Sequence, residues 1–129
     1  MPIRVVQLGS PRSKGEGVRI GTVRRPPLGV RKDDYGRQDF YDVWLPQLAP
    51  STELVKLAQE GLSKPSVWKR FEQRYYGELA EPDNSRLLDL LAALSKATDF
   101  AIGCYCADEN SCHRSILKRI LQERGASIL

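Results

Sequence analysis

All three cysteines and the only histidine of this chain lie in one short stretch near its C-terminal end. Cys104 and Cys106 close an apolar run, and Cys112 is followed directly by His113 and Arg114. A thiol at a helix N-terminus beside arginine and histidine has a lowered pKa and more thiolate character, which makes it a stronger nucleophile. The stretch therefore predicts Cys106 or Cys112 as a nucleophile and His113 as the group that carries the proton.

The same stretch predicts a site for an anion at the start of the last helix. Ser111 is a natural N-cap, which would place residues 112–114 in the first helical turn. Free backbone N–H groups and the positive end of the helix dipole favour anions there. Arg114 adds a planar fork that suits phosphate or carboxylate. We expect Ser111 and Arg114 to contact the anion.

Groups outside that helix complete the predicted site. Arg24 follows the second predicted strand, and it would reach the same pocket as Arg114 if that strand is parallel to the strand before Cys106. Glu109, together with Asp108, lies in the loop before the helix, where a carboxylate could orient His113 or exchange protons. The predicted ligand is an anionic small molecule, phosphorylated or carboxylated. No motif in the chain calls for a cofactor.

Three other interpretations of the cysteines stay open. Cys104, Cys106, Cys112 and His113 are four ligands that zinc accepts, although Cys-x-Cys differs from the usual Cys-x2-Cys spacing, so no metal is assigned. Cys106 and Cys112 could form a disulfide across the loop. Cys104 lies deeper in the strand and could pack there as a small hydrophobic side chain.

These side chains need a strand, a loop and a helix to position them. The run from Phe100 to Cys106 is apolar on both faces, which is typical of a strand that is covered on both sides of a sheet. Further strands are predicted at 3–8, 18–23 and 40–45, and further helices at 52–60, from Pro65 onward, and over the leucine-rich segment that ends near Thr98. We therefore predict an α/β fold, in one small domain over residues 1–129, with a parallel or mixed central sheet and helices on both faces. Ligands bind such sheets beyond the carboxyl ends of the strands.

Charge and length restrict the possible partners. The net charge is +4, and residues 1–37 hold nine Arg and Lys against three acids. This basic third favours anionic partners, so a module that binds nucleic acid or protein is an alternative hypothesis. It ranks second because no aromatic residue, on which a base could stack, lies among the charges before Tyr35. No apolar run approaches the ~20 residues of a membrane span, and no secretory signal is present. An unpaired set of three cysteines indicates a reducing, cytoplasmic setting. No pattern indicates the oligomeric state.

The middle and the C-terminal part of the chain carry a resemblance to a known family. Its residues are Trp44-Leu45, Leu48 to Leu54, Trp68, Phe71, Arg74-Tyr75, Glu78-Leu79, and Cys106 with Cys112-His113-Arg114. This pattern resembles the small bacterial YeaO-like proteins of domain-of-unknown-function family 488, including the Cys…Cys-His-Arg signature of the broader family. Where YeaO-like proteins usually carry Asp-Arg-Leu-Trp-Pro-Arg-Gly, this chain keeps only Arg24, Pro27 and Gly29. The resemblance implies an α/β fold and a cytosolic protein, and it implies no particular activity.

Overall fold

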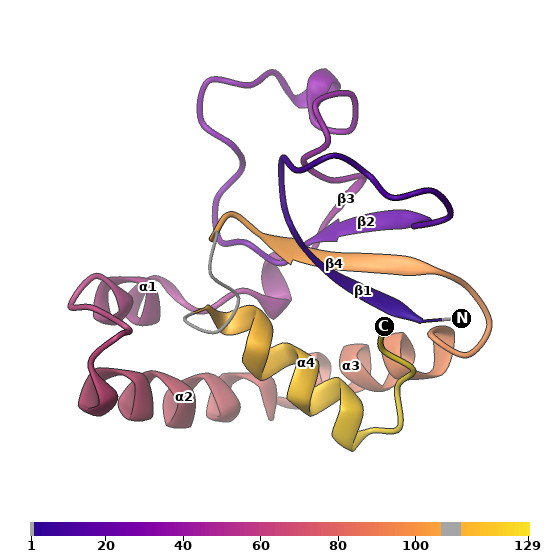
Figure 1. The fold of residues 1–129 in the computed structure, drawn as a ribbon. Coiled ribbons are helices and arrows are strands. Elements are labelled where there is room, and N and C mark those ends of the chain that lie inside the picture. The colour runs from indigo at the N-terminus through magenta and orange to yellow at the C-terminus, as the bar shows by residue number, and fades with distance from the viewer. Residues whose placement is uncertain (1, 107–111) are drawn as a thin grey trace.

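The computed structural model describes residues 2–106 and 112–129, which form a four-stranded parallel sheet and four α-helices (Figure 1). The strands are β1 (Ile3–Gln7), β2 (Val18–Gly21), β3 (Val43–Trp44) and β4 (Phe100–Cys104), and they lie in the order β1-β4-β2-β3. All three strand pairs are parallel. The predicted α/β class and parallel sheet are therefore confirmed.

Strand β4 lies inside the sheet, as its uniformly apolar sequence predicts. It pairs with β1 on one side and β2 on the other, so that Ile102 lies beside both Val5 and Ile20. All five of its residues are buried. Position 103 requires glycine, because a Cβ there would lie 2.8 Å from Cδ2 of Leu8.

The helices form one layer on one face of the sheet, as Figure 1 shows, so the prediction of helices on both faces is wrong in that respect. They are α1 (Thr52–Ala58), α2 (Pro65–Leu79), α3 (Pro82–Leu94) and α4 (His113–Glu123). Ser51 caps α1 by accepting a hydrogen bond from the backbone N–H of Leu54. Pro82 takes the first position of α3, because the missing N–H of proline costs nothing there. The buried faces of all four helices meet β1, β2 and β4 in one hydrophobic core.

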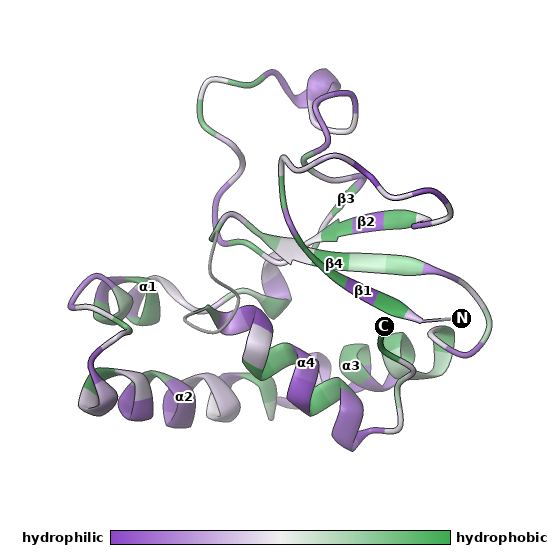
Figure 2. Ribbon diagram, viewed as in Figure 1, coloured by the Kyte–Doolittle hydropathy of each residue, from purple (hydrophilic) through white to green (hydrophobic). Residues whose placement is uncertain are grey.

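The opposite face of the sheet carries loops and a short 3₁₀ helix, η1 (Lys32–Asp34). A second 3₁₀ helix, η2 (Pro46–Leu48), follows β3. Arg19 points from β2 into the loop layer, where it pairs with Glu16 and donates to two backbone carbonyls. Figure 2 shows polar residues along these loops and hydrophobic ones along β1 and β4.

The strands are shorter than the sequence suggested. Strand β4 ends at Cys104 rather than Cys106, and β2 ends at Gly21 rather than Val23. Just after the end of β2 the backbone still contacts β4, because the Thr22 N–H donates to the carbonyl of Gly103. None of the helices in the described ranges combines the length and apolar character needed to cross a lipid bilayer.

Candidate functional site

Three cysteines converge beyond the carboxyl end of β4. Cys104 is the last residue of that strand, Cys106 follows two residues later, and Cys112 immediately precedes α4. Their sulfur atoms all lie within 4.8 Å of one another, and the Cys104 and Cys112 sulfurs are 2.6 Å apart. Cys104 and Cys112 are buried, Cys106 is exposed, and all three are free thiols. Cys104 is thus buried as predicted, but its sulfur also belongs to this cluster, which we call the thiol cluster.

The start of α4 differs from the prediction by one residue. Cys112 has extended backbone angles and is itself the N-cap, so that His113 and Arg114 open the helix. The prediction that Ser111 caps the helix and Cys112 lies in its first turn is therefore wrong. Ser111, Glu109 and Asp108 lie outside the described residues.

His113 is buried and held in one orientation. Its Nε2 lies 2.7 Å from the carbonyl oxygen of Thr22 and 3.3 Å from the Thr22 hydroxyl, while its Nδ1 lies 3.6 Å from the sulfur of Cys112. A carbonyl oxygen can only accept, so Nε2 carries the proton and Nδ1 presents a lone pair to Cys112. Tyr75 packs against the ring edge, with the ring centres 5.7 Å apart. Burial lowers the pKa of His113 to about 4, so the ring is neutral near pH 7.

Arg114 is also buried, below the exposed cysteine. Its Nη2 donates to the carbonyl oxygen of Cys106 at 2.6 Å, and its side chain is almost fully enclosed. Its Nε has no hydrogen-bond partner among the described residues. Among the described residues, one N–H of this buried guanidinium is thus left without an acceptor, which is uncommon in a folded chain.

The thiols of the cluster differ in acidity. Hydrogen bonds from Cys104 and Cys112, assisted by the charge of Arg114, lower the pKa of the Cys106 thiol. Hydrogen bonding within the cluster and burial raise the pKa of Cys104. At Cys112, the hydrogen bond with Cys104 lowers the pKa, but the one with Cys106 and burial outweigh it and raise the value to about 11. The most acidic thiol of the cluster is therefore that of Cys106, the one exposed residue of the three.

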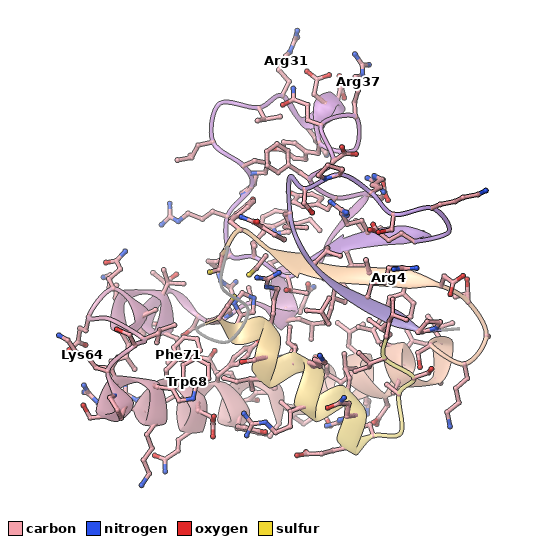
Figure 3. All side chains as sticks on the ribbon, in the orientation of Figure 1. Arg4, Arg31, Arg37, Lys64, Trp68 and Phe71 are labelled. Carbon is pink, nitrogen blue, oxygen red and sulfur yellow. The ribbon has the colours of Figure 1, made fainter. Side chains whose placement is uncertain are left out.

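The thiol cluster and His113 form the floor of a pocket of about 510 Å³. Its walls are mainly apolar, with Val23, Val55, Leu62 and Phe71 among the lining residues. Its charged lining residues are Arg24, Arg25 and Lys56, and no acidic residue of the described chain lines it. Figure 3 shows Phe71 on α2, next to Trp68 and beneath α1. The lining therefore combines basic side chains with mainly apolar walls.

Arg24 lines the pocket but also has a structural role. Its Nε donates to the carbonyl of Pro50, and its Nη2 donates to the carbonyls of Pro46 and Ala49. These bonds fasten the chain between η2 and α1 to the end of β2. Within the described residues, Nη1 is the one Arg24 nitrogen that makes no hydrogen bond. Arg114 donates to the carbonyl of Cys106 and is not among the lining residues, so the two arginines do not line the pocket together as predicted.

Comparison with protein families identifies the chain. A family model described as the active DUF488-N3 subclade matches residues 3–125. The chain belongs to the DUF488 family. No curated protein and no solved structure matches it. The DUF488 match covers β1 through α4 and includes the whole thiol cluster.

In this DUF488 chain the thiol cluster could hold a metal ion, because three sulfurs within 4.8 Å can turn toward one centre. His113, the fourth ligand of the predicted zinc set, is not part of that group. Its Nε2 is engaged by Thr22, and its Nδ1 faces Cys112.

Several basic residues of the N-terminal third serve the fold. Arg12 pairs with Asp39 and Asp42, and Arg19 pairs with Glu16. Arg31 and Arg37 project from the loop around η1, at the top of Figure 3 and far from α4. Some basic residues of the N-terminal third thus form ion pairs within the fold, and others lie on a loop away from the thiol cluster.

Sequence reasoning missed three contributors to the site. Thr22 orients His113, and Arg25 and Lys56 supply charge to the pocket. Lys56 is one of two exposed lysines in α1 and α2, and its type and spacing carry no signal. Thr22 directly precedes Val23 and Arg24 at a strand end, and only the pairing of β2 with β4 brings it to His113.

Proposed function

We propose that this DUF488 protein is an enzyme that uses the Cys106 thiolate to attack an anionic small molecule bound in the pocket. The observation that carries the proposal is the position of Cys106: it is an exposed residue that lines the pocket, beside two buried thiols, and its carbonyl accepts from the Arg114 guanidinium. Thiol donors and a cation stabilise a thiolate, and exposure gives a substrate access to it. The name of the matched subclade, which describes it as active, agrees with this proposal.

The pocket supports a ligand with a carboxylate or phosphate attached to an apolar body. Arg25 and Lys56 give its wall a positive charge, and the buried Arg114 guanidinium binds the Cys106 carbonyl. Apolar side chains cover most of the remaining wall. Removal of water from these walls would strengthen the attraction between the ligand and the basic groups.

His113 takes part through Cys112 rather than by direct contact with Cys106. Its neutral Nδ1 faces the Cys112 sulfur, so it can receive a proton from that thiol once the substrate has reacted. Three free thiols also suit a reducing compartment, and we propose that the protein works in the cytoplasm.

A matched pair of alkylating reagents tests this function. Iodoacetate is negative and iodoacetamide is neutral, so the ratio of their rates at Cys106 reports the charge of the pocket. We expect Lys56→Met combined with Arg25→Met to lower the iodoacetate to iodoacetamide ratio about fivefold, as expected when two nearby cations are removed. Lys69→Met, on α2 and outside the pocket lining, is the control. An unchanged ratio in the double variant would contradict an anion pocket, and alkylation that avoids Cys106 would contradict the nucleophile.

A metal centre is the second candidate function, because the geometry of the thiol cluster favours it. Zinc or another soft cation bound by Cys104, Cys106 and Cys112 would leave one position open toward the pocket. Elemental analysis of protein purified without a histidine tag tests this candidate. About one zinc per chain that is lost in Cys104→Ser would support it, and metal-free protein with three titratable thiols would exclude it.

A further inference from the structure

We propose that the substrate is a small, negatively charged disulfide, which the thiol cluster reduces by thiol–disulfide exchange through Cys106 and Cys112. This inference rests on the proposed nucleophile and specifies the reaction. The observation behind it is that an exposed thiol at the floor of a basic pocket has a buried thiol within 4.8 Å, and that this second thiol faces the lone pair of His113.

The second and third thiols need an explanation that a simple nucleophile does not provide. Attack on a carbon or phosphorus centre uses one sulfur, and Cys106 alone would suffice. Cys104 and Cys112 are buried, so a bulky substrate cannot reach them directly. Their place beside Cys106 suits a resolving thiol, which attacks a disulfide that has already formed on the neighbouring cysteine.

The reaction balances in two exchanges. The Cys106 thiolate attacks one sulfur of the disulfide R–S–S–R, a Cys106–S–S–R bond forms, the R–S–S–R bond breaks, and RS⁻ leaves. Cys112 then gives its proton to Nδ1 of His113, and its sulfur attacks the Cys106 sulfur and expels the second RS⁻. The His113 proton passes to that leaving thiolate, and the first takes a proton from solvent. Two protein thiols become one disulfide, and the substrate gains the two electrons.

Cys112 is assigned as the resolving thiol rather than Cys104 because of its partner. Among the described residues, only Cys112 has a base in contact with its sulfur, at 3.6 Å from Nδ1 of His113. Thr22 holds that base in the tautomer that can accept the proton. Cys104 contacts the Cys112 sulfur at 2.6 Å and can donate a hydrogen bond to the thiolate as it forms.

The charge of the pocket selects among disulfides. Arg25 and Lys56 line it with no opposing carboxylate from the described residues, so a disulfide with carboxylate groups should enter more readily than a cationic one. Oxidised glutathione is an anionic probe, hydroxyethyl disulfide is neutral, and cystamine is cationic. The same S–S bond is cleaved in all three, so their rates, divided by those of a free small thiol, report the pocket alone.

The test reacts fully reduced protein with each disulfide and measures lost thiols and the mass of the product. We expect wild type to lose two thiols, form a Cys106–Cys112 disulfide and release both halves of the substrate, at least fivefold faster with oxidised glutathione than with cystamine. Cys112→Ser should stop at the mixed disulfide on Cys106. Rapid acid quenching of wild type should catch the same mixed disulfide briefly, which provides a test that does not depend on the variant's folding.

The failure of this inference differs from the failure of the proposed function. If Cys106 is alkylated as expected but wild type keeps a stable mixed disulfide with glutathione, the exchange is overturned and the nucleophile stands. A faster reaction with cystamine would overturn the choice of an anionic disulfide. If neither alkylating reagents nor disulfides modify Cys106, both proposals fail together.

Discussion

The carbonyl oxygen of Thr22 lies 2.7 Å from Nε2 of His113, and this bond turns the other ring nitrogen toward Cys112. It joins the end of β2 to the first residue of α4, across a chain separation of 91 residues. The contact fixes both the tautomer and the direction of the imidazole, so one backbone group determines which cysteine the histidine can serve.

Two amides at position 113 should separate the structural role of the ring from its chemical role. His113→Gln can place its amide N–H near the Nε2 position and keep the bond to Thr22, whereas His113→Asn places an acceptor near the Nδ1 position and loses that bond. We expect the Asn variant to lose about 1–3 kcal/mol more free energy of unfolding than the Gln variant, because the Thr22 carbonyl is left unpaired. Urea denaturation monitored by circular dichroism measures this difference.

Both variants should be impaired in disulfide exchange. Neither amide can take the proton of Cys112, so formation of the internal disulfide should be at least tenfold slower than in wild type while alkylation of Cys106 keeps its rate. An exchange rate in the Gln variant equal to that of wild type would show that His113 serves only the fold.

The buried pair of Glu16 and Arg19 should make a large contribution to stability. Both side chains are almost fully enclosed, and the guanidinium binds the carboxylate through Nε and Nη2. We expect Glu16→Gln to lower the free energy of unfolding by about 3 kcal/mol at pH 7, since it leaves a buried cation without its partner. The control is Asp34→Asn, which removes the pairing of the half-buried Asp34 with the exposed Arg37 and should change stability by less than about 0.5 kcal/mol.

The pH dependence of that pair has a definite sign. Burial raises the pKa of Glu16, but hydrogen bonds from Arg19 and the Ser13 backbone outweigh it and hold the pKa below its usual value. The stabilisation is therefore complete above the unfolded pKa of about 4.3 and is lost as pH falls through the lower folded value. Urea denaturation from pH 7 to 3 should show a steeper loss in wild type than in Glu16→Gln, and parallel curves would contradict this ion pair.

Two glycines in the loop before β2 form a natural comparison. Gly15 and Gly17 both have positive φ angles, of 76° and 81°, so alanine should be strained by about 1–2 kcal/mol at each position. A Cβ at Gly15 meets nothing within 4 Å, whereas one at Gly17 would lie 2.1 Å from the carbonyl oxygen of Asp99. We expect Gly17→Ala to be destabilised by at least 2 kcal/mol more than Gly15→Ala, because the backbone entering β4 must move. Similar melting temperatures would argue against that close approach.

The sequence was informative where a pattern is local. The apolar run at 100–106 predicted a covered strand, and the cluster of Cys112, His113 and Arg114 predicted both the last helix and the place of the site. These signals depend on neighbours in the chain, so they survive without knowledge of the fold. The exact ends of β4 and α4 did not follow from the pattern, because pairing and capping determine them.

The parts that could not be predicted depend on contacts between distant segments. Cys104 joins the thiol cluster only because β4 ends there and α4 returns beside it. Arg24 was expected to bind the ligand, but its Nε and Nη2 donate hydrogen bonds to backbone carbonyls of the segment from η2 to the start of α1. Neither arrangement has a signature in the spacing of residues along the chain.

The pH dependence of the alkylation of Cys106 by iodoacetamide tests the central claim most directly, with the modified residue identified by peptide mass. A thiolate stabilised by two thiols and Arg114 predicts that Cys106 reacts first and that its rate rises with a midpoint well below the value of about 8.5 for a free cysteine. A midpoint at or above 8.5, or first modification at Cys104 or Cys112, would contradict the claim.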